Sequence, residues 1–108
     1  MDAQEINATI VVLQDAHTAL YDAIENDTAA VYALEDAKAQ AISDGLIVGK
    51  NAEEREAKAA TILQEQIGKR RITEADVRYK RMMLERATLN YERVKYTIRL
   101  MEAINNAV

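Results

Sequence analysis

The stretch that decides the fold is Ser43-Asp44-Gly45-Leu46-Ile47-Val48-Gly49-Lys50-Asn51-Ala52-Glu53-Glu54-Arg55-Glu56, which separates two long helical patterns. Gly45 is expected to end the first helix, because the residue after a helix often needs a positive φ, which glycine adopts without a Cβ clash. Asn51 is a predicted N-cap, whose side chain accepts a backbone N–H of the next turn. Glu54 follows in the position of a capping box. The stretch therefore predicts a tight connection between two helices.

Long helices are expected on both sides of this connection, because the 108 residues contain no proline, which would break a helix interior. Gly68 is expected to stop the second helix, and Thr73 is expected to cap the third. The predicted fold class is all-α, a single helical domain over residues 1–108 that forms an elongated helical hairpin or bundle. The two long coiled-coil helices and the short middle helix are expected over residues 3–44, 73–106 and 52–67, respectively.

The first predicted helix carries apolar residues every three or four positions, which is the spacing of a coiled-coil seam. His17, Asp27 and Lys38 interrupt this seam, and each is expected to fix the register of helix pairing. A second stripe beside it is mostly alanine, which lets another helix approach closely. The predicted seam is Ile6, Ile10, Leu13, His17, Leu20, Ile24, Asp27, Val31, Leu34, Lys38 and Ala41, and the alanine-rich stripe is Val12, Ala16, Ala19, Ala23, Asn26, Ala30, Ala33 and Ala37.

The width of these two stripes predicts more than one neighbour for the first helix, because such a face exceeds what one helix covers. We therefore expect the chain to bind itself as a homo-oligomer, such as a dimer. The third helix has one predicted seam with the same spacing. That seam is Val77, Lys80, Leu84, Ala87, Tyr91, Val94, Ile98, Met101, Asn105 and Val108.

The charge of the chain changes sign along its length. Residues 2–44 contain nine acids and one base, a net charge of −8, whereas residues 45–72 and 73–108 carry +2 each. The acidic and basic parts can attract each other when helices pack side by side. Carboxylates on the first helix can also act as phosphate mimics toward a positive groove. The candidate partner-binding acids are Asp15, Asp22 and Glu25.

Several classes of function lack the residues that they need. Cysteine is absent, which excludes disulfides, thiolate metal sites and cysteine nucleophiles. The single histidine, His17, has no acidic residue three or four positions away, and no serine lies in a nucleophile elbow. The stretch Gly45–Asn51 lacks the spacing and the Ser or Thr of a phosphate-binding loop. We therefore predict a non-enzymatic protein without a metal or another cofactor.

The sequence also predicts a cytoplasmic protein that does not associate with a membrane. No apolar run approaches the roughly 18 residues that a spanning helix needs. Residues 1–5 carry two acids and no base, unlike the start of a signal peptide.

A cluster of bases around the start of the third helix is a further functional candidate. Residues 69–86 hold seven bases against three acids, and Tyr79 among them can stack on an unpaired nucleic-acid base. The alternative is that these bases face the acidic first helix. The candidate contacts of this cluster are Lys69, Arg70, Arg71, Arg78, Lys80, Arg81 and Arg86, and those of the turn, where no core role is expected, are Lys50, Asn51 and Arg55.

The segment Gly45–Ala57, with Gly-Lys-Asn-Ala-Glu-Glu-Arg at Gly49–Arg55, resembles small uncharacterised helical proteins of tailed phages and prophages. In those proteins a long helix ends in a glycine-containing turn, this motif opens a short helix, and a charged coiled-coil helix follows. The resemblance implies a phage origin, often near recombination or replication genes, and action by binding a host protein such as a defence nuclease. The basic turn Gly68–Arg71 departs from the neutral or acidic turn of those proteins.

Two functional hypotheses follow from these features. The first is a non-enzymatic, phage-type coiled-coil protein that binds a macromolecular partner and inhibits a host defence protein or nucleic-acid-binding protein. The alternative is a nucleic-acid-binding accessory factor of phage recombination or replication that uses the basic third helix. A purely structural assembly protein is a third possibility, in which neither charged set matters outside self-association.

Overall fold

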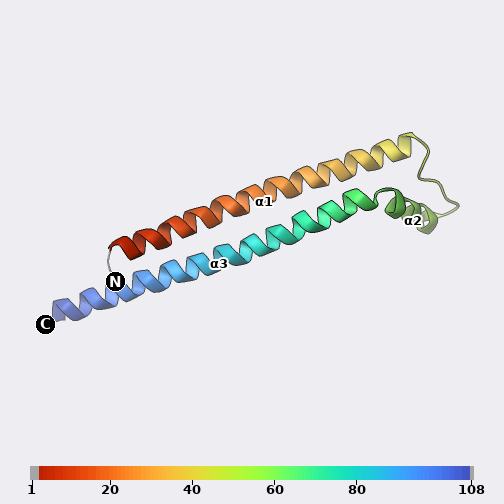
Figure 1. Cartoon of the computed structure of the whole chain (residues 1–108). Helices are drawn as coiled ribbons and strands as arrows, with labels where there is room; N and C mark the ends of the chain where they lie inside the picture. Colours follow the sequence, from red (N-terminus) through yellow and green to blue (C-terminus); the bar gives the residue numbers. More distant parts are fainter. Residues whose placement is uncertain (1–2, 108) are drawn as a thin grey trace. The chain divides into compact units, whose positions relative to one another are not determined.

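The computed structural model of the chain describes residues 3–107 and contains no strand within that range. Within these residues, three helices follow one another along the chain (Figure 1). They are α1 (Ala3–Ser43), α2 (Ala52–Ile62) and α3 (Gln64–Ala107). The predicted all-α class, with two long helices and a short one between them, is therefore confirmed.

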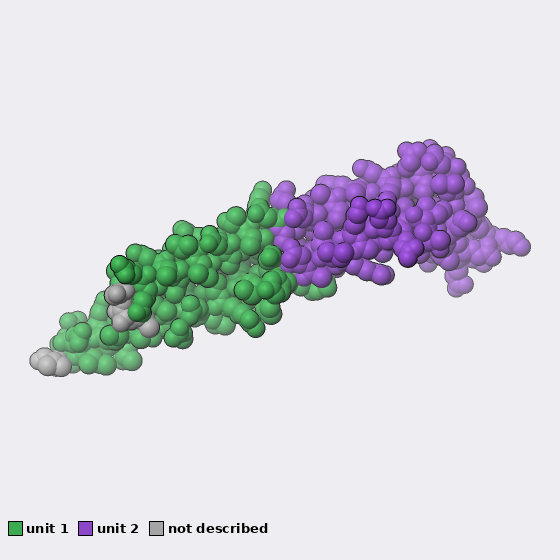
Figure 2. All heavy atoms as spheres, viewed as in Figure 1, with its two compact units in different colours: residues 1–22, 78–108 green, residues 23–77 purple. Residues whose placement is uncertain are grey.

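The chain forms two compact units, which Figure 2 shows in different colours. Unit 1 contains residues 1–22 and 78–108, so it pairs the first part of α1 with the last part of α3. Unit 2 contains residues 23–77, with the rest of α1, the connection, α2 and the start of α3. Within unit 2, α1 and α3 run antiparallel, because Asp27 contacts Arg70 whereas Leu34 lines one hollow with Ile67.

The buried face of α1 differs from the predicted seam at three positions. His17 and Lys38 are exposed, and Ile24 is 39% exposed, so the prediction that these residues belong to the packed seam is wrong, whereas the predicted seam residues Ile10 and Val31 are half-buried. The positions immediately before them, Ala16 and Ala23 among others, are covered instead. The packed row, at alternating spacings of three and four, is Ile6, Thr9, Leu13, Ala16, Leu20, Ala23, Asp27, Ala30, Leu34, Ala37 and Ala41.

The reason for this register is that small side chains let two helices approach closely while polar side chains stay in water. Rotating α1 by one position exchanges His17 for Ala16 and Lys38 for Ala37, and both changes remove a polar group from the packed face. Much of the alanine-rich stripe thus packs inside the chain. The two predicted stripes of α1 therefore contribute to one packed face. A second neighbour is no longer needed to cover α1, and self-association stays a prediction.

The predicted seam of α3 is confirmed over most of its length. Val77, Ala87 and Val94 are buried, and the seam residues between them are half-buried. Toward the end of the helix, Met101 and Asn105 are exposed, and Val108 lies outside the described residues.

The boundary between the second and third helices differs from the prediction. The helix breaks at Leu63, which is buried, whereas Gly68 and Thr73 lie inside α3 and neither stops nor caps a helix. The break is short: the N–H of Leu63 still donates to the carbonyl of Ala59 at 2.8 Å, and the N–H of Ile67 to that of Leu63 at 2.9 Å. A helix interior tolerates one glycine at a cost of about 1 kcal/mol relative to alanine, so Gly68 alone does not end the helix.

Candidate functional site

The turn after α1 is a Schellman motif, as the glycine at its centre predicted. Gly45 has a φ of +72°. The N–H of Leu46 donates to the carbonyl of Ala41 at 2.9 Å, and the N–H of Gly45 donates to that of Ile42 at 3.1 Å. These two hydrogen bonds satisfy carbonyl groups that the end of a helix otherwise leaves open.

Asn51 caps α2 as predicted, because its side-chain oxygen accepts the N–H of Glu54 at 2.9 Å. The carboxylate of Glu54 accepts the N–H of Lys50 at 2.7 Å, one residue earlier than in a standard capping box. Arg55 donates from Nη1 to the carbonyl of Gly49 at 3.3 Å. Asn51 and Arg55, which are also candidate partner contacts, therefore hold the turn, whereas the side chain of Lys50 lies in the exposed part of it.

Gly49 is required by a close approach rather than by its backbone angle. A Cβ at this position would lie 2.7 Å from the Cβ of Glu54 and 2.9 Å from the backbone nitrogen of Arg55. Real Cβ atoms essentially never come so close to other atoms. The two ends of the segment Gly49–Arg55 therefore contact each other.

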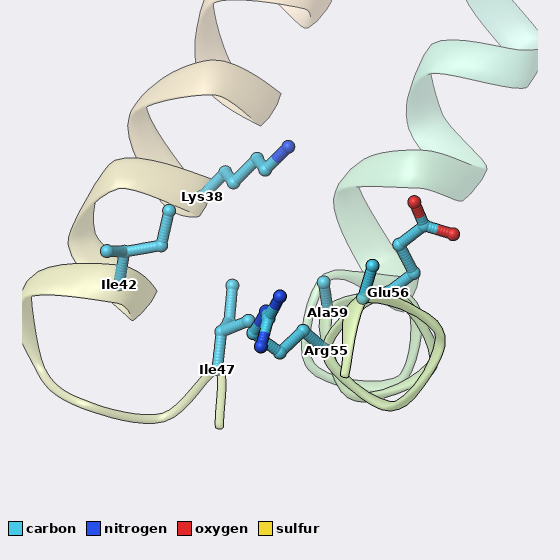
Figure 3. A pocket seen from close by; sticks show the side chains of 7 residues that line it. Lys38, Ile42, Ile47, Arg55, Glu56 and Ala59 are labelled. Atoms are coloured by element: carbon cyan, nitrogen blue, oxygen red, sulfur yellow. The ribbon is translucent and has the colours of Figure 1, made fainter. Parts of the chain in front are cut away.

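A surface hollow of about 370 Å³ lies between the end of α1, the connection and α2. Figure 3 shows Lys38 of α1 reaching across its mouth, with Glu56 on the α2 side and Arg55 beside Ile47. Its remaining lining residues are Ile42, Ala52 and Ala59. Lys38 thus lines an open apolar hollow instead of fixing the register of a seam.

Arg70 and Asp27 form an ion pair between α3 and α1 in unit 2. Nε of Arg70 lies 2.9 Å from Oδ1 of Asp27, and the hydroxyl of Thr73 donates to the same oxygen at 2.8 Å. Hydrogen bonds from Arg70 and then from Thr73 lower the pKa of Asp27 below its ordinary value of 3.8. Of the three polar interruptions predicted to fix register, Asp27 alone lies in the packed row, where it makes a directional contact.

The remaining candidate residues lie on the surface. Asp15 and Asp22 in unit 1 and Glu25 in unit 2 are exposed, and none of them forms an ion pair with another described residue. On α3, Lys69 pairs with Glu65 at 3.1 Å, one turn away in the same helix. The other bases of the predicted cluster are exposed at Arg71, Arg78, Arg81 and Arg86, and Lys80 is half-buried. Their roles in partner binding stay predictions.

The sequence prediction missed a second row of residues on α3, all within unit 1, which we call the outer seam. Its spacing alternates strictly between three and four residues, as in a coiled-coil seam. At 100° per residue it lies about 160° around the helix from the packed seam. It consists of Tyr79, Met82, Arg86, Leu89, Arg93, Tyr96 and Leu100, all exposed. The repeat is visible in the sequence, but Arg86 and Arg93 interrupt its apolar residues.

Leu89, Tyr96 and Leu100 are 67%, 58% and 61% exposed. The helix thus presents an apolar row to α1 on one side and a second apolar row to solvent on the other. Within the described residues, no group of three or more His, Cys, Asp or Glu side chains lies close enough together to hold a metal ion. Nor does this part of the chain contain a helix that is long and apolar enough to cross a membrane.

No protein family matches the sequence, and no match was found among curated proteins or solved structures.

Proposed function

We propose that the protein is a non-enzymatic binding protein that engages a macromolecular partner through the exposed face of α3 in unit 1. The observation that carries this proposal is the outer seam, in which large apolar side chains recur with the spacing that another helix recognises. Contiguous apolar patches on a protein surface mark interaction sites more often than isolated apolar residues do. The buried apolar core, by contrast, consists largely of alanine and valine.

The resemblance of Gly49–Arg55 to small phage proteins supports a bacterial host protein as this partner. Inhibition of that protein, either a defence protein or a nucleic-acid-binding protein, is then the consequence of binding. The exposed acids Asp15, Asp22 and Glu25 are a second contact in this proposal, because unpaired surface carboxylates complement a positive groove.

Site-specific photo-cross-linking tests the proposal. A photoreactive amino acid replaces Leu89 in the outer seam or, as a control, Tyr32, which is 62% exposed on α1. After irradiation in a bacterial extract, we expect a defined adduct from position 89 and none from position 32. Reversal of Asp15, Asp22 and Glu25 to lysine is expected to weaken the adduct if the acids contribute. The proposal would be contradicted if position 89 gave no adduct in extracts of bacteria in which the protein is active.

A second candidate, a nucleic-acid accessory factor, is favoured by the cations beside two exposed tyrosines. Nζ of Lys80 lies 5.4 Å from the ring centre of Tyr79, and Nζ of Lys95 lies 5.3 Å from that of Tyr96. Aromatic rings next to cations bind single strands by stacking and charge. The affinity for labelled single- and double-stranded DNA should then rise steeply as the salt concentration falls. The triple variant Arg78→Glu/Arg81→Glu/Arg86→Glu should abolish that binding. Absence of binding at low salt would exclude this candidate.

A further inference from the structure

The outer seam has the geometry that one helix uses to bind another. Side chains at alternating spacings of three and four residues form a row that stays on one side of a helix, and a second helix inserts its own side chains between them. Tyr79 and Leu100 mark the two ends of the row, which covers about 30 Å at 1.5 Å per residue. A helix of about three heptads would cover it.

Two arginines lie inside this apolar row, and they determine what can cover it. Arg86 and Arg93 stand seven residues apart, with Leu89 between them, and the seam contains no acidic residue. Within the described residues, the guanidinium of Arg93 donates a hydrogen bond to the neutral amide oxygen of Asn90 at 2.8 Å and not to a carboxylate of its own helix. A covering helix would remove both cations from water, which is costly unless it supplies carboxylates opposite them.

The charges beside the seam do not change this requirement. One neighbouring row consists of Arg78, Glu85, Glu92 and Arg99, in which the positive and negative charges balance. The net charge of the face therefore comes from the two arginines in the seam itself.

A second copy of the chain fits this face poorly. Pairing of two α3 helices through their outer seams would bring Arg86 and Arg93 of both copies into one apolar interface. In unit 1, α1 exposes Val11, Val12 and Tyr21 as its large apolar residues, and these do not recur at spacings of three and four. In the same unit, α1 of a second copy exposes Asp15 and Asp22 seven residues apart, but a row at spacings of three and four through these acids holds one large apolar residue, Val11 or Val12. A second copy thus offers the acids without the apolar row that would cover the outer seam.

We propose that the outer seam binds an amphipathic helix of another protein, whose apolar row carries acidic residues seven positions apart, facing Arg86 and Arg93. This inference rests on the proposed function and specifies its partner. The leucines and tyrosines of the seam contribute apolar contact area, and the two arginines select the partner by charge and fix its register.

Two synthetic helices test the inference. Both are about 28 residues long, with leucine in the apolar row, and they differ only in carrying glutamate or lysine at the two positions seven residues apart. Fluorescence anisotropy is expected to show that the protein binds the glutamate peptide about tenfold more tightly than the lysine peptide, or better. The double variant Arg86→Glu/Arg93→Glu is expected to reverse that preference. A gain of binding to the lysine peptide cannot come from a misfolded protein.

Matched variants define the seam in the same assay. Leu89→Asp should abolish binding of both peptides, whereas Lys58→Glu, at an exposed base of α2 outside the seam, should leave the preference unchanged. Equal binding of the two peptides, failure of the double variant to reverse the preference, or an equal loss in the Lys58 variant would overturn the inference. So would sedimentation of the free protein as a dimer that Leu89→Asp converts to a monomer, or displacement of the glutamate peptide by single-stranded DNA. If position 89 forms a cross-linked adduct in the extract but the protein binds neither peptide, the inference is wrong and the proposed function stands.

Discussion

Nε of Arg70 on α3 donates a hydrogen bond to Oδ1 of Asp27 on α1, with 2.9 Å between the two atoms. Asp27 and Arg70 are both partly covered, with side-chain exposures of 20% and 34%. Nη1 of Arg70 also lies 3.8 Å from a carboxylate oxygen of Glu74, one turn further along α3. Sliding one helix past the other would separate this pair, so a single directional contact fixes the register of α1 and α3 within unit 2.

Replacing Asp27 by asparagine is expected to lower the free energy of unfolding at pH 7. The hydrogen bond of Arg70, followed by that of Thr73, holds the pKa of Asp27 below 3.8 in the folded protein. The unfolded chain therefore binds the proton more tightly than the folded one. The stabilisation by Asp27 is fully present above the unfolded pKa and is lost as pH falls through the lower, folded pKa.

The measurement is urea unfolding of the wild type and of Asp27→Asn, followed by circular dichroism, at pH 7 and at stepwise lower pH. The difference between the two proteins should shrink once the pH falls below about 4. The exposed residue Asp36 provides the control, because Asp36→Asn should match the wild type at every pH. A difference that is constant from neutral to acidic pH would rule out the ion pair as its cause.

The three glycines should respond differently to alanine. Gly49→Ala is expected to destabilise by about 1–3 kcal/mol, because the added Cβ would lie 2.7 Å from the Cβ of Glu54. Gly45→Ala should cost about 1–2 kcal/mol, since φ is +72° there. Gly68→Ala should stabilise by about 0.5–1 kcal/mol, because the space is open and the residue is helical. Thermal unfolding checks the order, and a stabilised Gly49 variant would contradict the close approach.

Removal of the cap at Asn51 should destabilise the protein by about 1 kcal/mol. Asn51→Ala loses the acceptor for the N–H of Glu54, whereas Asn51→Asp keeps it. Each kcal/mol corresponds to a shift in melting temperature of about 4–8 °C for a domain of 60–100 residues. Equal melting temperatures of the two variants would show that the cap contributes nothing to folding.

The register of α1 can be tested by enlarging neighbouring positions. Ala23 is 2% exposed, so Ala23→Leu should overpack the helix interface and cost about 1–3 kcal/mol. His17→Leu, which would have improved the seam predicted from the sequence, should change stability by no more than about 0.5 kcal/mol, because His17 is exposed. Urea unfolding of both variants distinguishes the two registers, and the opposite order of stabilities would restore the predicted one.

The sequence predicted what short-range contacts decide. The end of α1 at Gly45 and the start of α2 after Asn51 depend on backbone groups within a few residues, and both were found as expected. The fold class followed in the same way from helical periodicity and from the absence of proline.

What the sequence could not decide depended on which neighbour each face meets. Ala16 and His17 stand side by side, and only the packing of α3 selects the smaller residue. Gly68 and Thr73 carry local signals for a helix boundary, but the helix breaks at the buried Leu63 instead. The hydroxyl of Thr73 donates a hydrogen bond to Asp27. The outer seam was missed because Arg86 and Arg93 interrupt its apolar residues, so that the row resembles a solvated, charged face.

The packed row of α1 keeps its alternation of three and four residues from Ile6 to Ala41 without interruption. Insertion or deletion of one residue anywhere in that stretch would turn all following side chains by about 100° and move alanines out of the interface. The length of this helix is therefore constrained as tightly as its composition. Relatives that differ in length here should differ by multiples of seven residues, whereas single insertions should be confined to the connection after Gly45.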